Sequence, residues 1–99
     1  MQVSISFSPL YQKDIRRAVT ILKEAGCSKV FLFGSLASGN VREGSDIDLA
    51  VRGCPQGKFF FLLGKLLMEL EHPIDLVDLD KASAFARYLE KEGELIQVD

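Results

Sequence analysis

The chain has 99 residues, enough for one domain with a single modest core. With 47% hydrophobic and 26% charged residues, it is typical of a globular domain, which excludes a disordered tail. Twelve basic and fourteen acidic residues give a net charge of −2, so the positive field that nucleic-acid binding usually requires is missing. We therefore expect a single domain over residues 1–99 and no nucleic-acid polymer as the main ligand.

No segment is typical of a membrane span or of export. The longest unbroken apolar run is Phe59 to Leu63, whereas crossing a bilayer takes about 20 residues. Met1 to Ser8 lacks the basic start and the apolar stretch of a secretory signal. We therefore predict a cytoplasmic location. Cys27 and Cys54 could form one disulfide, but in such a chain two reduced thiols are the expected state.

The first predicted element is a helix that begins at Ser8-Pro9 and ends at Gly26. Serine caps a helix start well, and proline costs nothing at the first helical position. Apolar residues recur along it at steps of three and four, which predicts one buried stripe. Lys13 and Asp14 are expected to face water. The stripe comprises Ile15, Ala18, Val19, Leu22 and Ala25.

Two strands are predicted next. Lys29 to Phe33 is apolar on both sides, as in a strand covered on both faces. A polar, glycine-rich stretch covers 34–45, and residues 46–52 then alternate between polar and apolar side chains, as in a half-buried strand. The intervening stretch leaves barely enough room for a helical crossover, so we favour a mixed sheet over a parallel one.

A second long helix is predicted from 58 to 71, and it ends at His72 because the residue before a proline disfavours helical geometry. The third strand is expected at 74–79. A last helix would begin with Asp80 or Ser83 as its cap. The resulting order of helices and strands predicts an α/β (α+β) fold, a small mixed β-sheet with flanking helices.

The helix at 58–71 has more apolar residues than one buried face needs. Phe61 and Met68 fall on the side opposite its core stripe. Either the C-terminal segment covers them, or they form a protein interface, since exposed apolar patches commonly mark partners. The second alternative predicts an oligomer, of like or unlike chains, formed through this helix.

Acidic residues on two of the strands predict a metal site. Asp46 and Asp48 are two residues apart on a strand, so both carboxylates project from one face and repel each other unless a cation bridges them. Hard oxygen ligands of this kind suit Mg²⁺. Asp75 interrupts an apolar strand, where an unpaired carboxylate would be expensive to bury, so we expect it to be a third ligand. Asp78 and Asp80 fall on the other face and are interpreted as solvated or capping residues.

Gly34 and Ser35 predict a phosphate-binding turn beside these carboxylates. Glycine directly after a buried strand lets the backbone turn sharply and approach a ligand, while the following N–H groups and hydroxyl hold phosphate oxygens. The chain lacks the longer glycine-rich loop that ends in Gly-Lys-Ser or Gly-Lys-Thr, which excludes a P-loop ATPase.

Read in place as FGSLASGNVREGSDIDLAV, the Gly-Ser and Asp-x-Asp motifs resemble the signature of the minimal nucleotidyltransferases, members of the DNA polymerase beta-like superfamily. Phe33, Gly39 and Ser45 also fall where that family places them. The strand that contains Asp75 resembles the third acidic strand of the family. The resemblance covers nearly the whole chain and leaves Met1 to Phe7 unassigned.

This resemblance implies a polymerase beta-like fold, two Mg²⁺ ions and transfer of a nucleoside monophosphate, with ATP as the expected substrate. Asp46, Asp48 and Asp75 would be the catalytic and metal-binding residues, and the last would activate the acceptor hydroxyl through the ion or as a direct base. Gly34, Ser35 and Ser45 would bind the nucleotide. Single-domain members often pair with an all-helical HEPN toxin and neutralise it by transferring AMP to a tyrosine hydroxyl, so such a protein is the expected partner.

One departure from the family favours a second hypothesis. Many members carry Arg directly after the Gly-Ser, where this chain has Leu36, and Arg42 or Lys58 would have to supply the missing charge. The alternative is a binding module of the same fold that neutralises a helical partner by contact alone. His72 is interpreted as a terminal residue favoured by the helix dipole rather than as a catalytic base.

Overall fold

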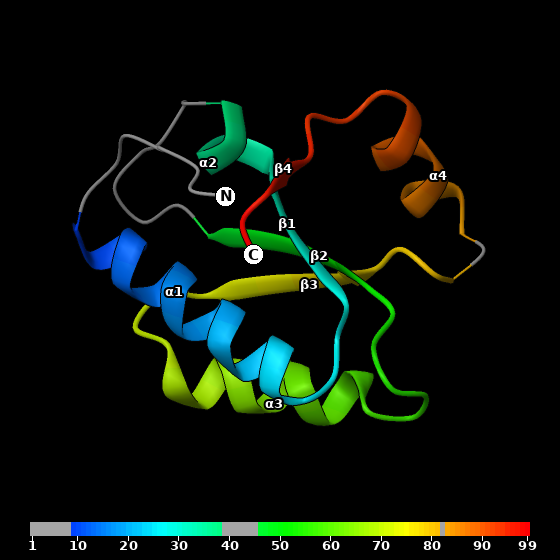
Figure 1. Cartoon of the computed structure of the whole chain (residues 1–99). Helices are drawn as coiled ribbons and strands as arrows, with labels where there is room; N and C mark the ends of the chain where they lie inside the picture. Colours follow the sequence, from blue (N-terminus) through cyan, green and yellow to red (C-terminus); the bar gives the residue numbers. More distant parts are fainter. Residues whose placement is uncertain (1–8, 39–45, 82) are drawn as a thin grey trace.

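The computed structural model describes residues 9–38, 46–81 and 83–99, and for residues 9, 10, 35 and 38 it describes the backbone alone. None of the helices in these ranges is long and apolar enough to cross a membrane. Figure 1 shows the elements, which are α1 (Pro9–Glu24), β1 (Lys29–Phe33), α2 (Gly34–Ser38), β2 (Ile47–Arg52), α3 (Phe59–Glu69), β3 (Ile74–Asp78), α4 (Ala84–Lys91) and β4 (Ile96–Gln97).

The sheet is mixed, as the sequence predicts. Its strand order is β3-β2-β1-β4. β1 runs antiparallel to both β2 and β4, whereas β2 and β3 are parallel. The connection between β1 and β2 contains only the short α2, so the chain turns back on itself, while α3 provides the crossover that a parallel pair requires. The acidic strands β2 and β3 are consequently direct neighbours.

Helices cover both faces of the sheet, but unequally. α1 and α3 lie together on one face, and the shorter α4 lies on the other (Figure 1). The larger core fills the space under α1 and α3 and includes Leu22, Leu32, Leu49 and Leu66. On the α4 side, a smaller cluster joins Phe33, Ala50, Leu79, Ala86 and Leu89. Part of the α4 face therefore stays available for a site.

Two details near the turns refine the expected elements. The stretch after β1 is helical over its first five residues, because Leu36 is only 1% exposed and anchors α2 in the larger core. Of the two expected caps of the last helix, Ser83 is the one used: its Oγ accepts a hydrogen bond from the Ala86 N–H at 3.1 Å. Asp80 accepts instead from the Gly53 N–H at 2.6 Å, which fixes the end of β2.

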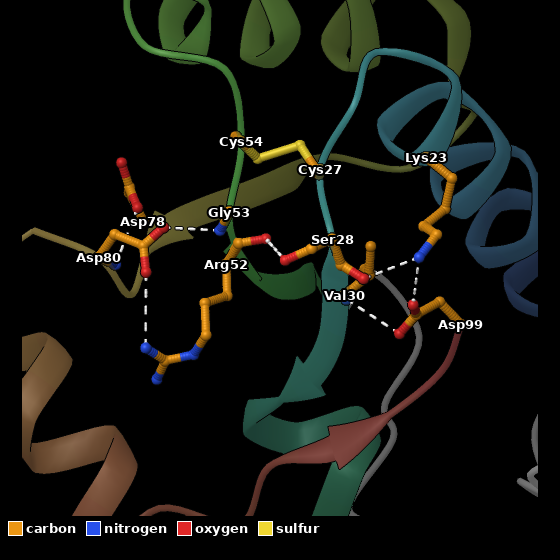
Figure 2. Close-up of a disulfide and its surroundings, with 10 residues drawn as sticks. All are labelled: Lys23, Cys27, Ser28, Val30, Arg52, Gly53, Cys54, Asp78, Asp80 and Asp99. Atoms are coloured by element: carbon orange, nitrogen blue, oxygen red, sulfur yellow. Dashed lines mark hydrogen bonds and ion pairs between the residues drawn. A yellow bond between two sulfur atoms is a disulfide. The ribbon is translucent and has the colours of Figure 1, made fainter.

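The expectation of two reduced thiols is wrong for this structure, because Cys27 and Cys54 form a disulfide. The pairing of Lys29 with Arg52 in the antiparallel ladder, continued outward by two residues on each strand, places the two cysteines opposite each other. Figure 2 shows the bond linking the segments that enter β1 and leave β2, next to the hydrogen bond from Ser28 Oγ to the Arg52 carbonyl. The cysteines come together only through the pairing of β1 with β2, which their sequence positions do not reveal.

Asp14, expected in water, is 3% exposed and is the buried charged residue of the described chain. Its carboxylate accepts hydrogen bonds from the backbone N–H groups of Glu71 and His72, and its Oδ2 lies 2.7 Å from His72 Nδ1. The His72 ring also stacks on Tyr11 at 3.9 Å between centroids. This network fixes the turn between α3 and β3, and it gives His72 a structural role.

The C-terminal tail docks on the sheet and leaves α3 uncovered. Ile96 and Gln97 pair with β1, and the Asp99 carboxylate accepts from the Val30 N–H at 3.0 Å and pairs with Lys23 (Figure 2). These contacts hold the pKa of Asp99 below its usual value, although burial alone would raise it. Cover of the surplus apolar face by the tail is therefore wrong for the described residues, and Phe61 and Met68 remain exposed.

Candidate active site

Asp48 on β2 and Asp75 on β3 lie side by side in the sheet. They are direct partners in the parallel register, and Asp46 precedes the first residue of β2. Since side chains alternate along a strand, Asp48 shares its face with Ala50, which belongs to the core under α4. The carboxylates thus lie on the sheet face that carries α4, outside the area that α4 covers.

The three carboxylates interact electrostatically at Asp48, whose pKa is raised from 3.8 to about 6. Partial burial of this side chain is the main cause, followed by repulsion from the charges of Asp75 and Asp46 and by a hydrogen bond with Asp75. Like charges at close range favour the neutral form of one of them. The arrangement therefore costs the protein free energy unless a cation compensates the charge.

Gly34 allows the backbone to pass directly over the Asp48 carboxylate. A Cβ atom on this residue would lie 2.1 Å from Asp48 Oδ2, well inside contact distance. The backbone of Gly34 also has φ of +74°, which side chains rarely adopt. The glycine of the Gly-Ser motif thus lies against the Asp48 carboxylate.

We expect Gly34→Ala to damage the site more than the fold. The new methyl group must displace the Asp48 carboxylate, and the left-handed backbone adds strain of about 1–3 kcal/mol. Nucleotide binding should weaken at least tenfold, as measured by isothermal titration with ATP and Mg²⁺. Gly57→Ala is the matched control, because Gly57 has a similar φ of +81° and no atom within 4 Å of an added Cβ. Equal losses in both variants would contradict the role of Gly34.

The structure brings only some of the expected site residues together. Ser45 and Arg42 lie outside the described residues, and so does the side chain of Ser35, whose backbone begins α2 with Gly34. Lys58 is not at the site, because it precedes α3 on the other side of the sheet, where its Nζ lies 5.7 Å from the Phe61 ring centroid. It therefore does not replace the arginine that the motif lacks.

Sequence reasoning did not predict the exposure of one aromatic side chain that contacts Phe33. Phe85 is half exposed and contacts the ring of Phe33 edge-on, at 6.1 Å between centroids. Phe33 is the direct partner of Asp48 in the ladder, so the contact with Phe85 links α4 to the strand position next to this carboxylate. Phe85 lies four residues before Leu89, a spacing that predicts a shared buried stripe. α4 buries Ala86 and Leu89 instead.

The carboxylates offer a donor set that fits Mg²⁺, although they do not form a complete site by themselves. Within the described residues, no group of three or more His, Cys, Asp or Glu side chains is arranged to hold a metal ion. Magnesium in phosphate-transfer sites typically uses one or two carboxylates and completes its shell with substrate phosphates and water. The paired carboxylates of Asp48 and Asp75 meet that requirement, and their mutual repulsion favours a cation.

Comparison with solved structures identifies three informative neighbours. The chain resembles a chain of a toxin–antitoxin complex with AMP-PNP, with 26% identity and a TM-score of 0.65 over 89% of this chain and 73% of that one. It also resembles a structure described as a minimal nucleotidyltransferase, with 27% identity and a TM-score of 0.62 over 89% and 96% of the two chains.

The third neighbour comes from a Shewanella oneidensis complex of a tri-AMPylated HEPN toxin with an MNT antitoxin. Identity is 28% and the TM-score is 0.54, over 73% of this chain and 58% of that one. No curated protein matches the sequence at a significant level. The family model for the polymerase beta nucleotidyltransferase domain matches residues 17–98, which include the Gly-Ser turn and all three carboxylates. The chain therefore belongs to the polymerase beta nucleotidyltransferase family.

Proposed function

We propose that the protein transfers AMP from ATP to a hydroxyl group of a helical HEPN-type toxin and thereby acts as its antitoxin. The observation that carries this proposal is the contact of Gly34 with Asp48, which is itself paired in register with Asp75. This contact places a backbone turn suited to phosphates directly beside carboxylates suited to Mg²⁺. A binding module would have no need of the repulsion that raises the pKa of Asp48.

Each site residue has a proposed role. Asp46, Asp48 and Asp75 would hold two Mg²⁺ ions, which supply positive charge that stabilises the transferring phosphate. The backbone at Gly34 and Ser35 would bind the β- and γ-phosphates, with Ser45 as a further nucleotide-binding residue. The site thus combines phosphate positioning with charge compensation, and these are the main requirements of phosphoryl and nucleotidyl transfer.

The proposed reaction is an in-line displacement at the α-phosphorus of ATP. The acceptor hydroxyl oxygen forms a bond to that phosphorus, the bond to the bridging oxygen of the β-phosphate breaks, and pyrophosphate leaves. The hydroxyl proton passes to Asp75, whose side chain is exposed and therefore accessible to an acceptor on another protein. Asp48 is partly buried, which favours a role in binding over proton transfer.

The partner and the substrate are inferred from the neighbours. Two toxin–antitoxin complexes resemble this chain, one with AMP-PNP and one with an AMPylated HEPN toxin. We also propose a cytoplasmic location, where ATP is available. The Cys27–Cys54 disulfide weighs against that location, because cellular reductants keep most cytosolic thiols reduced.

The direct test incubates the protein with α-labelled ATP, Mg²⁺ and a HEPN-type protein encoded beside it. We expect label on the partner, and we expect Asp46→Ala to abolish it because the charge that binds the metal is lost. Asp78→Asn is the matched control, since Asp78 lies on β3 and accepts a hydrogen bond from the Asp80 N–H at 2.9 Å instead. An unlabelled partner with wild-type protein would reject the transfer reaction.

Neutralisation by contact alone remains the second candidate, and Leu36 is the observation that favours it. This residue is buried in the core, so the position that carries Arg in many related proteins contributes no charge to a triphosphate. In that case a variant without catalytic carboxylates, such as Asp48→Asn, should still protect cells that express the toxin. Loss of protection in this variant would favour transfer.

A further inference from the structure

The outer side of α3 exposes an apolar stripe. Relative exposure is 75% for Phe60, 65% for Phe61, 53% for Leu67 and 87% for Met68. Leu62 and Leu66 of the same helix are buried in the core, so the stripe lies on the side that faces away from the sheet. None of these four residues belongs to the proposed active site, which lies on the other face of the sheet, beyond the part that α4 covers.

Gly64 lies at the centre of this stripe. Phe60 and Phe61 precede it by four and three positions, and Leu67 and Met68 follow it by three and four. All five residues therefore share one helical face. Glycine in the middle of a helix is unfavourable, and a Cβ atom at Gly64 would meet nothing within 4 Å. Packing within the chain therefore does not require glycine here, whereas close approach of another backbone would.

We propose that this face binds a second copy of the chain through an antiparallel pair of α3 helices, with the two-fold axis at Gly64. The order of the apolar residues along α3 favours a second copy of the chain as the partner of this face. A two-fold axis at Gly64 places Phe60 against Leu67 and Phe61 against Met68 of the other copy, so aromatic side chains meet flexible aliphatic ones on both sides. The proposal does not rest on the transfer reaction.

The exposed area is close to what a specific dimer needs. A large apolar side chain buries about 150–250 Å² when fully covered. The four exposed side chains thus present roughly 500 Å² per copy, at the upper end of the apolar patches found on monomers. Burial in both copies would remove about 1,000 Å² of surface, the lower limit for a biological interface. We therefore expect a dimer at micromolar protein concentration.

Sedimentation velocity of the full chain between 1 and 200 µM tests the proposal. We expect a concentration-dependent dimer in the wild type and a monomer in Gly64→Glu, because two carboxylates would meet at the axis. This substitution has open space in the monomer, and unchanged circular dichroism would show that it still folds. Tyr88→Glu is the control, since Tyr88 is 57% exposed on α4 and should leave the dimer intact.

Crosslinking tests the register. The native cysteines are already joined, so Gly64→Cys adds a single thiol, which should form a covalent dimer under mild oxidation. Tyr88→Cys should remain monomeric under the same conditions. A mixture of Phe61→Cys and Met68→Cys should give the mixed dimer in at least tenfold excess over either self-crosslinked dimer.

Three outcomes would overturn the proposal. The first is a wild-type chain that stays monomeric at 200 µM. The second is a dimer that Gly64→Glu leaves unchanged, which would place the interface elsewhere. The third is loss of binding to the helical toxin in Gly64→Glu, together with a monomeric wild type, which would assign the face to that protein. Failure of AMP transfer, by contrast, would leave the dimer prediction unaffected.

Discussion

Asp48→Asn is expected to stabilise the protein and at the same time to abolish its proposed activity. The variant removes the charge that Asp75 and Asp46 repel, so at pH 7.5 the free energy of unfolding should rise. The full change in the pKa of Asp48 would correspond to a larger gain, but solvent screening of this half-exposed group reduces our expectation to about 1 kcal/mol. AMP transfer should fall at least a hundredfold because a ligand of the metal is lost.

The gain in stability of Asp48→Asn should depend on pH in a defined direction. In the folded protein the pKa of Asp48 is about 6, above its usual value of 3.8, so the folded state binds the proton more tightly. The contribution of Asp48 to the free energy of unfolding is fully present below about pH 4 and is lost as pH rises towards 6. The advantage of Asp48→Asn in urea unfolding should therefore shrink between pH 7.5 and pH 4.5.

Addition of ATP and Mg²⁺ should make the wild type more stable than Asp48→Asn. ATP with Mg²⁺ at a hundred times its dissociation constant adds about 2.7 kcal/mol to the wild type. Asp48→Asn should gain much less in the same thermal-shift measurement. Asp78→Asn, which keeps all three site carboxylates, should respond as the wild type does. A destabilised Asp48→Asn variant with normal ATP response would contradict our interpretation of the site.

Removal of the disulfide by Cys27→Ser with Cys54→Ser is expected to lower the free energy of unfolding by about 3.5 kcal/mol. The crosslink joins residues 27 positions apart, and closing a loop of this length restricts the unfolded chain by about that amount. For a domain of this size, such a loss is a large part of the total stability. Urea unfolding of the oxidised wild type and the double variant measures it directly.

A reductant provides the control for this prediction. Dithiothreitol should lower the urea midpoint of the wild type to that of the double serine variant and should leave the variant unchanged. Alkylation of the protein inside cells, before lysis, would show whether the thiols are free at the proposed location. Two free thiols in the purified, air-oxidised protein would contradict the disulfide itself.

Most of the fold follows from local sequence patterns. The apolar run before Gly34 predicts a strand that is buried on both faces. The alternation after Asp46 predicts a strand that is buried on one face only. The short connection between them correctly predicts a mixed sheet rather than a parallel one. α2 was missed because five residues are too few to show a helical period, and because burial of Leu36 depends on packing against distant elements.

Asp14 shows why polarity alone misplaces a residue. It precedes Ala18 by four positions and Ile21 by seven, so its spacing puts it in phase with the buried stripe of α1. Its charge argued for solvent, but its partners come from the end of α3, more than fifty positions away. The cysteine pairing has the same cause, since only the register of β1 and β2 brings the two thiols together.

The positions of some candidate site residues could be predicted from the sequence. Asp48 lies on a strand of alternating polar and apolar residues, and Asp75 interrupts an apolar strand; both patterns drew attention to these carboxylates, and the structure makes the two strands neighbours. The approach of Gly34 to the Asp48 carboxylate follows from the turn after β1, which the resemblance implied. The exposed position of Phe85 could not be predicted, because it depends on how little of the sheet α4 covers.

The position of β3 at the edge of the sheet has a consequence for solubility. β3 pairs only with β2 among the described strands, so its outer backbone groups are open to pairing with another chain. Asp75 and Asp78 lie on this strand, and charged side chains on an edge discourage the addition of foreign strands. Asp75, which we assign to chemistry, would then also help to protect the protein against aggregation.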